Sequence, residues 1–163
     1  MPGFNFKRLN HITIIYRVVQ IIMTLLLLFM VYYFQRLFAV NGKPVQIVYS
    51  FFASIIFQLI LFYPTYRLSS RDANIEIESC ALDISVETLV ALRKKRLLND
   101  LWKCCVVIFY ITFVSMAPDA KKSSGAPLVL STSIFSFLLT CLTYFQGFNF
   151  CAKRQLKQMS ATV

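Results

Sequence analysis

The chain has 163 residues, of which 58% are hydrophobic, and it carries a formal net charge of +10. This hydrophobic share is well above that of a soluble domain, and too few residues remain for a soluble domain of ordinary size. The basic residues lie beside apolar stretches instead of on one soluble face, which argues against a nucleic-acid-binding protein. Composition therefore predicts an integral membrane protein whose partners include lipids and exclude nucleic acid.

Four long uncharged stretches follow one another, at residues 18–35, 44–66, 104–118 and 123–152. A helix needs about 20 largely apolar residues to cross a hydrocarbon core of roughly 30 Å. The apolar runs are continuous and do not alternate with polar residues, which favours helices over the strands of a membrane barrel. We therefore predict an all-α, integral membrane four-helix bundle with spans at about 14–38, 45–66, 101–118 and 127–150.

The first predicted span follows a short polar tail, residues 1–13. Its apolar run exceeds that of a secretory signal peptide and lacks a small-residue cleavage site, so we expect it to be retained. Asn41, Gly42 and Pro44 then predict a tight turn into the second span.

The distribution of Lys and Arg predicts the orientation of the four spans. Most of these residues lie in the N-terminal tail, in the segment 67–103 and in the C-terminal tail 152–163; Arg36, Lys43, Lys121 and Lys122 lie on the other side. By the positive-inside rule, both termini and the segment between spans two and three should face the cytosol. We expect the plasma membrane or a secretory-pathway endomembrane.

Residues 67–100 form the predicted cytosolic loop, the longest polar segment of the chain. Its first part, 69–83, is acidic and is expected to be extended or irregular, whereas residues 85–101 have the pattern of an amphipathic helix with a basic face. This helix could lie on an anionic leaflet or form the water-exposed start of span three. The residues expected to contact anionic lipid are Arg93, Lys94, Lys95, Arg96 and Lys103, and Trp102 is expected to anchor the interface.

Five cysteines are present, and none lies in a predicted outer loop. We therefore expect no disulfide in an oxidising lumen. Cys104, Cys105 and Cys151 fall at predicted cytosolic ends of spans and are candidates for palmitoylation. The alternative is that they are small buried hydrophobic residues.

The fourth span carries small polar residues near helical spacing. Such a stripe lets helices approach closely in lipid, so it predicts a helix-packing face more readily than a transport path. The residues of this predicted face are Ser131, Thr132, Ser136, Thr140 and Thr143.

The sequence shows no pattern typical of an enzyme. No acidic residue lies inside a predicted span, the single histidine, His11, has no second histidine for a metal pair, and Cys104 and Cys105 are adjacent instead of forming C-x-x-C. We expect no catalytic residue, no metal site and no cofactor.

Short motifs give a family resemblance. They are Arg17-Val18-Val19-Gln20 at the start of span one, 59–64 at the end of span two, and 98–102, Phe109-Tyr110 and 115–117 around span three. With four spans, the chain resembles the MARVEL-type membrane-associating tetraspan family, particularly its fungal members. The predicted loop 67–100 is longer than is usual in that family. The resemblance implies a role in membrane organisation without catalytic residues.

Two functions follow as hypotheses. The first is a non-enzymatic tetraspan protein that organises lateral membrane domains, trafficking or membrane-protein assembly. The second is a small accessory or regulatory subunit of a larger membrane enzyme or transporter. The first predicts homo-oligomers and lipid contact, and the second predicts one larger membrane-protein partner.

Overall fold

A computed structural model describes residues 6–80, 85–116 and 125–161 of the chain. These residues form four helices: α1 (Phe6–Val40), α2 (Gln46–Glu78), α3 (Val86–Ser115) and α4 (Ala126–Ala161). Each helix contains a stretch that is long and apolar enough to cross a membrane. The prediction of an all-α chain with four helices long and apolar enough to span a membrane is therefore confirmed.

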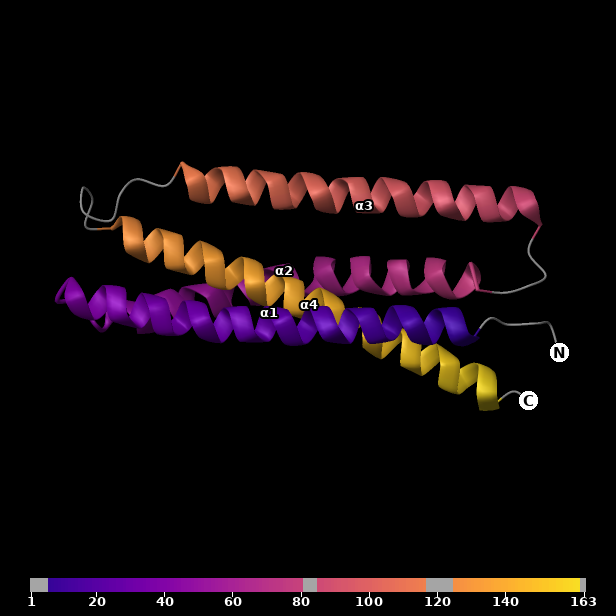
Figure 1. Cartoon of the computed structure of the whole chain (residues 1–163), viewed down its shortest axis with the longest axis horizontal. Coiled ribbons are helices and arrows are strands. Elements are labelled where there is room, and N and C mark those ends of the chain that lie inside the picture. The colour runs from indigo at the N-terminus through magenta and orange to yellow at the C-terminus, as the bar shows by residue number, and fades with distance from the viewer. Residues whose placement is uncertain (1–5, 81–84, 117–124, 162–163) are drawn as a thin grey trace.

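In Figure 1, α1, α2 and α3 run nearly along the long axis of the molecule, and α4 is inclined across them. The start of α1, the end of α2, the start of α3 and the end of α4 all lie at the same end of the bundle. We call this the terminal end, because α1 begins and α4 ends there, and we call the other the opposite end. At the opposite end, α1 passes into α2 through a short turn in which Gly42 has a φ of 67°. This left-handed conformation carries little steric cost for glycine.

The helices are longer than a bilayer requires. They contain 35, 33, 30 and 36 residues in chain order, whereas about 20 residues cross the hydrocarbon core. Because the uncharged stretches extend towards the opposite end, the surplus helical turns lie at the terminal end. The chain therefore continues as helices beyond its predicted spans.

The segment 67–100, predicted to be a loop, is mostly helical. Residues 67–78 complete α2, and α3 begins at Val86 and continues without a break into its apolar part. The expectation of an irregular 69–83 is thus wrong for 69–78, because Ala73 and Ile77 recur at helical spacing and are buried in the bundle. The helix at 85–101 is continuous with the apolar part of α3, and Ser85 is its N-cap.

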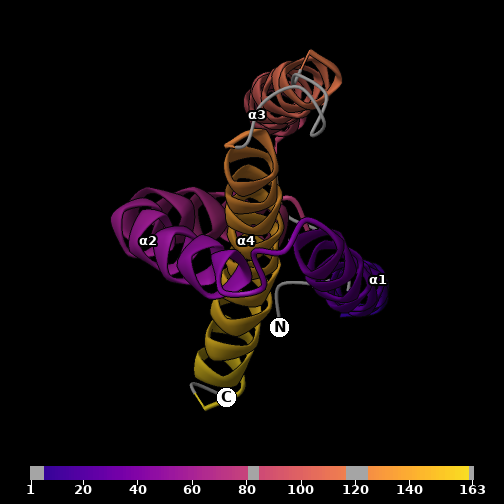
Figure 2. The ribbon, with the colours of Figure 1, turned by 90° about the vertical axis from the view of Figure 1, so that its left-hand side faces the viewer.

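Three helices form the core of the bundle, and the fourth lies at its edge. Viewed along the bundle in Figure 2, α4 lies between α1 and α2, while α3 lies outside this group. The contact between α2 and α4 is the most extensive, and α3 has few contacts with its neighbours. Leu92 is the one side chain of α3 classed as buried among the residues described.

Two clusters of buried side chains stabilise the ends of the bundle. At the opposite end, Phe34 and Phe38 of α1 pack against Phe135 of α4. At the terminal end, Leu9, Ala73, Ile77, Cys80, Phe148, Cys151 and Ala152 form a second cluster. Leu9, Ala73, Ile77 and Cys80 lie beyond the predicted spans, whereas Phe148 lies within the fourth, so this cluster packs the surplus turns of α1 and α2 against α4.

Candidate functional site

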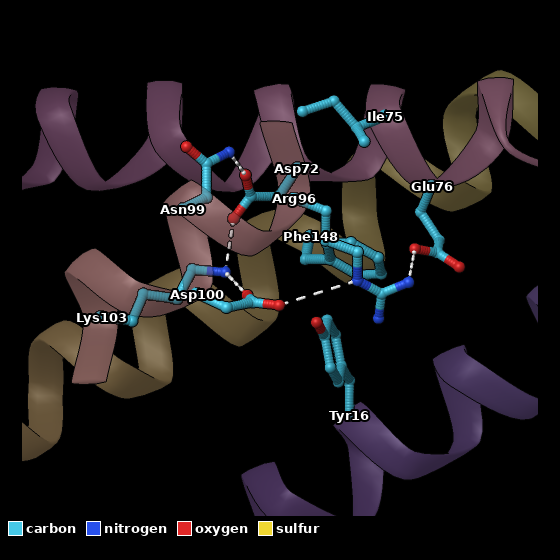
Figure 3. A pocket seen from close by; sticks show the side chains of 9 residues that line it. All are labelled: Tyr16, Asp72, Ile75, Glu76, Arg96, Asn99, Asp100, Lys103 and Phe148. Atoms are coloured by element: carbon cyan, nitrogen blue, oxygen red, sulfur yellow. Dashed lines mark hydrogen bonds and ion pairs between the residues drawn. The ribbon is translucent and has the colours of Figure 1, made fainter. Parts of the chain in front are cut away.

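Two carboxylates of α2 face the interior at the terminal end of the bundle (Figure 3). Asp72 and Glu76 are one helical turn apart, and their side chains are only 10% and 4% exposed. A buried carboxylate is stable only when cations and hydrogen-bond donors compensate for its lost hydration. The residues around these two groups therefore define the most polar enclosed part of the described structure.

Glu76 is compensated by arginines from two other helices. Arg8 of α1 lies 3.4 Å from Oε1 of Glu76, and Arg96 of α3 donates a hydrogen bond to Oε2. One carboxylate thus connects α1, α2 and α3. Arg96 also lies 3.8 Å from Asp100, which is half-exposed and adds a weaker pair within α3.

Asp72 is compensated by one cation and two neutral donors. Lys103 of α3 lies 2.7 Å from Oδ2, and Asn99 of α3 donates to Oδ1 at 2.8 Å. The hydroxyl of Tyr144 of α4 donates to Oδ2 at 2.7 Å. Lys103 also lies 4.9 Å from the centre of the Tyr144 ring. Asp72 therefore connects α2 with both α3 and α4.

The arrangement leaves no room for a substrate. The cavity between Tyr16, Asp72, Glu76, Arg96 and Lys103 has a volume of about 10 Å³, which is enough for about one water molecule. Within the described ranges, no three His, Cys, Asp or Glu side chains come together as metal ligands. The cluster is therefore a joint between four helices, which we call the charged joint: Arg8, Asp72, Glu76, Arg96, Asn99, Asp100, Lys103 and Tyr144.

A second set of polar contacts joins α2 and α4 within the apolar part of the bundle. Ser50 and Ser131 share a hydrogen bond of 2.7 Å, and Ser54 donates to the carbonyl of Thr132 at 3.1 Å. Nearer the terminal end, the amide of Gln58 accepts from Thr140 at 3.0 Å and donates to Thr143. Hydrogen bonds of this kind hold helices together in lipid, where water cannot satisfy the polar groups.

Four residues of the predicted packing face of α4 thus contact α2. The fifth, Ser136, has a buried hydroxyl without a hydrogen-bond partner in the described structure. The partners on α2, which are Ser50, Ser54 and Gln58, were not singled out from the sequence. Their spacing of four residues was a usable signal, because positions i and i+4 lie on the same helix face.

The predicted lipid-contacting residues fall into two groups in the structure. Arg93, Lys94 and Lys95 are exposed on α3. Arg96 and Lys103 pair with the carboxylates of α2, so they belong to the charged joint. The predicted interface anchor Trp102 is exposed on the outer surface of α3.

The palmitoylation candidates also differ in their surroundings. Cys104 and Cys105 are exposed on α3, whereas Cys151 is buried in the terminal cluster, with its thiol 3.7 Å from the hydroxyl of Tyr66. Acylation of Cys151 would require this packing to open. Cys80 is buried beside it, and burial raises the pKa of the Cys80 thiol.

The acidic members of the charged joint were missed by sequence reasoning. Asp72 and Glu76 were placed in an irregular acidic segment, yet their spacing of four residues fits one helix face. Ala73 and Ile77 have the same spacing of four residues, which indicates an apolar helix face next to the acidic residues. The acidic residues alone favoured a solvated loop, and only the packing of α2 against α1 and α4 shows why they are enclosed.

An apolar groove lies between α1, α3 and α4 towards the opposite end. It has a volume of about 240 Å³ and is lined by residues such as Leu26, Met30, Tyr110, Phe137 and Leu138. The rings of Tyr110 and Phe137 stack across it with centres 4.0 Å apart. Because the groove opens along the apolar surface, lipid tails can fill it without any specific contact.

Comparison of the chain with protein-family models, with curated proteins and with solved structures finds no match. The resemblance to MARVEL-type tetraspan proteins therefore stays a prediction from short motifs.

Proposed function

We propose that this protein is a non-enzymatic, multi-pass membrane protein that works by assembling with other membrane components. Its polar residues supply the main support. The carboxylates Asp72 and Glu76 and the amide of Gln58 are engaged in contacts between helices. Side chains committed to holding a bundle together are not available to bind or transform a substrate.

The edge position of α3 is the single observation that carries the assembly role. This helix is fixed by the charged joint at one end and by the stack of Tyr110 on Phe137 further along. Much of its surface, including Leu97, Trp102 and Phe109, is exposed. A spanning helix with this much free surface can pack against helices of other proteins.

The second candidate function is an accessory subunit of a larger membrane enzyme or transporter. The exposed basic run Arg93, Lys94 and Lys95 favours it over simple self-association, because like charges on neighbouring copies repel one another. Under either function, we place both termini in the cytosol by the positive-inside rule, and the protein in the plasma membrane or a secretory-pathway membrane.

The experiment that tests this function is extraction of the tagged, full-length protein in a mild detergent, followed by native mass spectrometry. We expect it to elute with one larger membrane-protein partner near one-to-one, or as self-oligomers with bound lipid. The first result makes it an accessory subunit, and the second makes it an organiser. If the protein elutes only as a lone monomer at every detergent concentration tested, the assembly role is contradicted.

A further inference from the structure

The outer side of α3 carries an apolar stripe along most of the helix. Val86, Val90, Leu97, Leu101 and Ile108 follow one another at intervals of four and seven residues, so they lie on one helix face. Each of these side chains is more than half exposed. The residues that attach α3 to α2, such as Arg96 and Lys103, lie on a different face.

The first part of this stripe lies beyond the reach of lipid tails. Lys103, where the uncharged part of α3 begins, is paired with Asp72 in the charged joint, which marks the edge of the hydrocarbon. At 1.5 Å per residue, Val90 lies roughly 20 Å further along the helix. The headgroup layer adds only about 5–7 Å beyond the hydrocarbon on each side. Val86 and Val90 therefore lie in water, where exposed apolar side chains are unfavourable.

The stripe continues into the membrane without interruption. Leu101 lies at the headgroup level, and Ile108 lies within the uncharged part of α3. A partner that covers the whole stripe must therefore cross the same boundary. A helix of another membrane protein fits this requirement, whereas lipid covers only the inner part.

Charge decides what kind of helix fits. Lys94 lies beside the stripe, four residues after Val90, and Arg93 flanks its other side; both are exposed, whereas Lys95 lies on the far side of the helix. A second copy in the same membrane orientation would place the same two cations against them. Like charges at such positions oppose pairing, and opposite charges favour it.

We propose that the stripe on α3 docks a helix of a different membrane protein, with apolar residues at matching intervals and acidic residues facing Arg93 and Lys94. This inference rests on the proposed function and names the chemistry of the partner. It assigns the basic run to an acidic protein segment, in place of the anionic leaflet expected from the sequence.

The test uses the full-length protein in nanodiscs of neutral phosphatidylcholine and two fluorescent helical peptides as probes. Both peptides carry leucines at intervals of four and seven residues; one has glutamates beside them and its twin has lysines. We expect fluorescence anisotropy to show binding of the glutamate peptide only. The double substitution R93Q/K94Q should weaken this binding by about fivefold or more, because screened charge pairs are lost.

Two variants separate the stripe from general electrostatic attraction. K153Q/R154Q removes the same charge from exposed positions of α4 and should leave binding unchanged, whereas Val90→Asp should abolish it without changing the helix content. Equal binding of both peptides, binding of neither, or an equal effect of K153Q/R154Q overturns the proposal. Disulfide-linked dimers of a Val90→Cys variant in neutral nanodiscs also overturn it, in favour of a second copy.

The two proposals fail in different experiments. Suppose that native mass spectrometry finds a stoichiometric partner, but the glutamate and lysine peptides bind equally. The assembly role then stands, and the proposal that the stripe on α3 docks an acidic helix is overturned. If the protein is always a lone monomer, the assembly role falls regardless of the peptide result.

Discussion

At the scale of single residues, the close contact between α2 and α4 depends on a glycine, which has no Cβ atom. Gly147 of α4 faces Ser69 of α2, and a Cβ atom added at position 147 would lie 2.4 Å from the Ser69 Oγ and 3.3 Å from its Cβ. The Ser69 hydroxyl is held by a hydrogen bond of 2.8 Å to the carbonyl of Tyr66. Small residues allow this close approach of helices in lipid.

We therefore predict that Gly147→Ala destabilises the bundle by about 1–3 kcal/mol, the usual range for overpacking. Helix propensity alone would stabilise the alanine variant by about 1 kcal/mol, so a loss of stability isolates the steric effect. The measurement is the thermal unfolding midpoint in detergent. Gly125→Ala is the matched control, because a Cβ there meets no atom within 4 Å.

The additional substitution Ser69→Ala should restore part of the stability lost by Gly147→Ala, since it removes the nearer of the two clashing atoms. If Gly147→Ala is as stable as Gly125→Ala, the helices do not approach as closely as the structure shows.

At the scale of the elements, the charged joint explains how α3 is attached. Glu76 contacts Arg8 and Arg96 and is almost fully buried, whereas Asp100 is 52% exposed and contacts residues of its own helix. The two carboxylates have the same charge but should contribute differently to the stability of the bundle. A buried carboxylate that connects helices should matter more than an exposed one.

Glu76→Gln should lower the stability of the protein by about 1–3 kcal/mol, since it leaves two arginines without their shared anion. The arginines are partly exposed and regain some hydration, which keeps the loss below that of a fully buried pair. Asp100→Asn should change stability by less than about 0.5 kcal/mol. Thermal unfolding in detergent measures both, and amide hydrogen exchange within 86–100 shows whether α3 loosens first. Equal effects of the two substitutions would mean that burial of Glu76 does not contribute.

At the scale of the whole molecule, the structure is a helical bundle longer than a membrane is thick. The terminal cluster packs turns of α1 and α2 that lie beyond their uncharged stretches, around Leu9 and Ala73, against Phe148 of α4. The ring of Tyr16 packs against Phe148 with centres 4.4 Å apart and extends this packing along the bundle. The helical turns at the terminal end are therefore packed as part of the same bundle.

Amide hydrogen exchange of the protein in nanodiscs should show slow exchange for residues 69–78 and 86–100. A solvated loop would exchange about as fast as the unfolded chain, whereas packed helices are protected by their backbone hydrogen bonds. The same segments in denaturant supply the reference for the unfolded state. Exchange of 69–78 at the reference rate would restore the expectation of an irregular loop.

The amino-acid sequence by itself determined the all-α class, the four helices long and apolar enough to span a membrane, and a packing face on the fourth of them. Each of these depends on a local property, because an apolar stretch in lipid has to satisfy its own backbone hydrogen bonds and therefore becomes a helix. The packing face on that helix could also be predicted, because small polar residues such as Ser131 and Thr140 recur near helical spacing along the chain.

Only the tertiary structure decided the path of residues 67–78, the burial of Asp72 and Glu76, and the pairing of Arg96 with Glu76. From the sequence alone, acidic residues next to a membrane span are expected to be solvated. The four consecutive basic residues 93–96 are expected to share one environment. In the bundle, helical rotation directs Arg96 towards Glu76 while Arg93, Lys94 and Lys95 remain exposed. Such pairings join residues far apart in the chain, so their energies follow from which helices pack together, which no local pattern specifies.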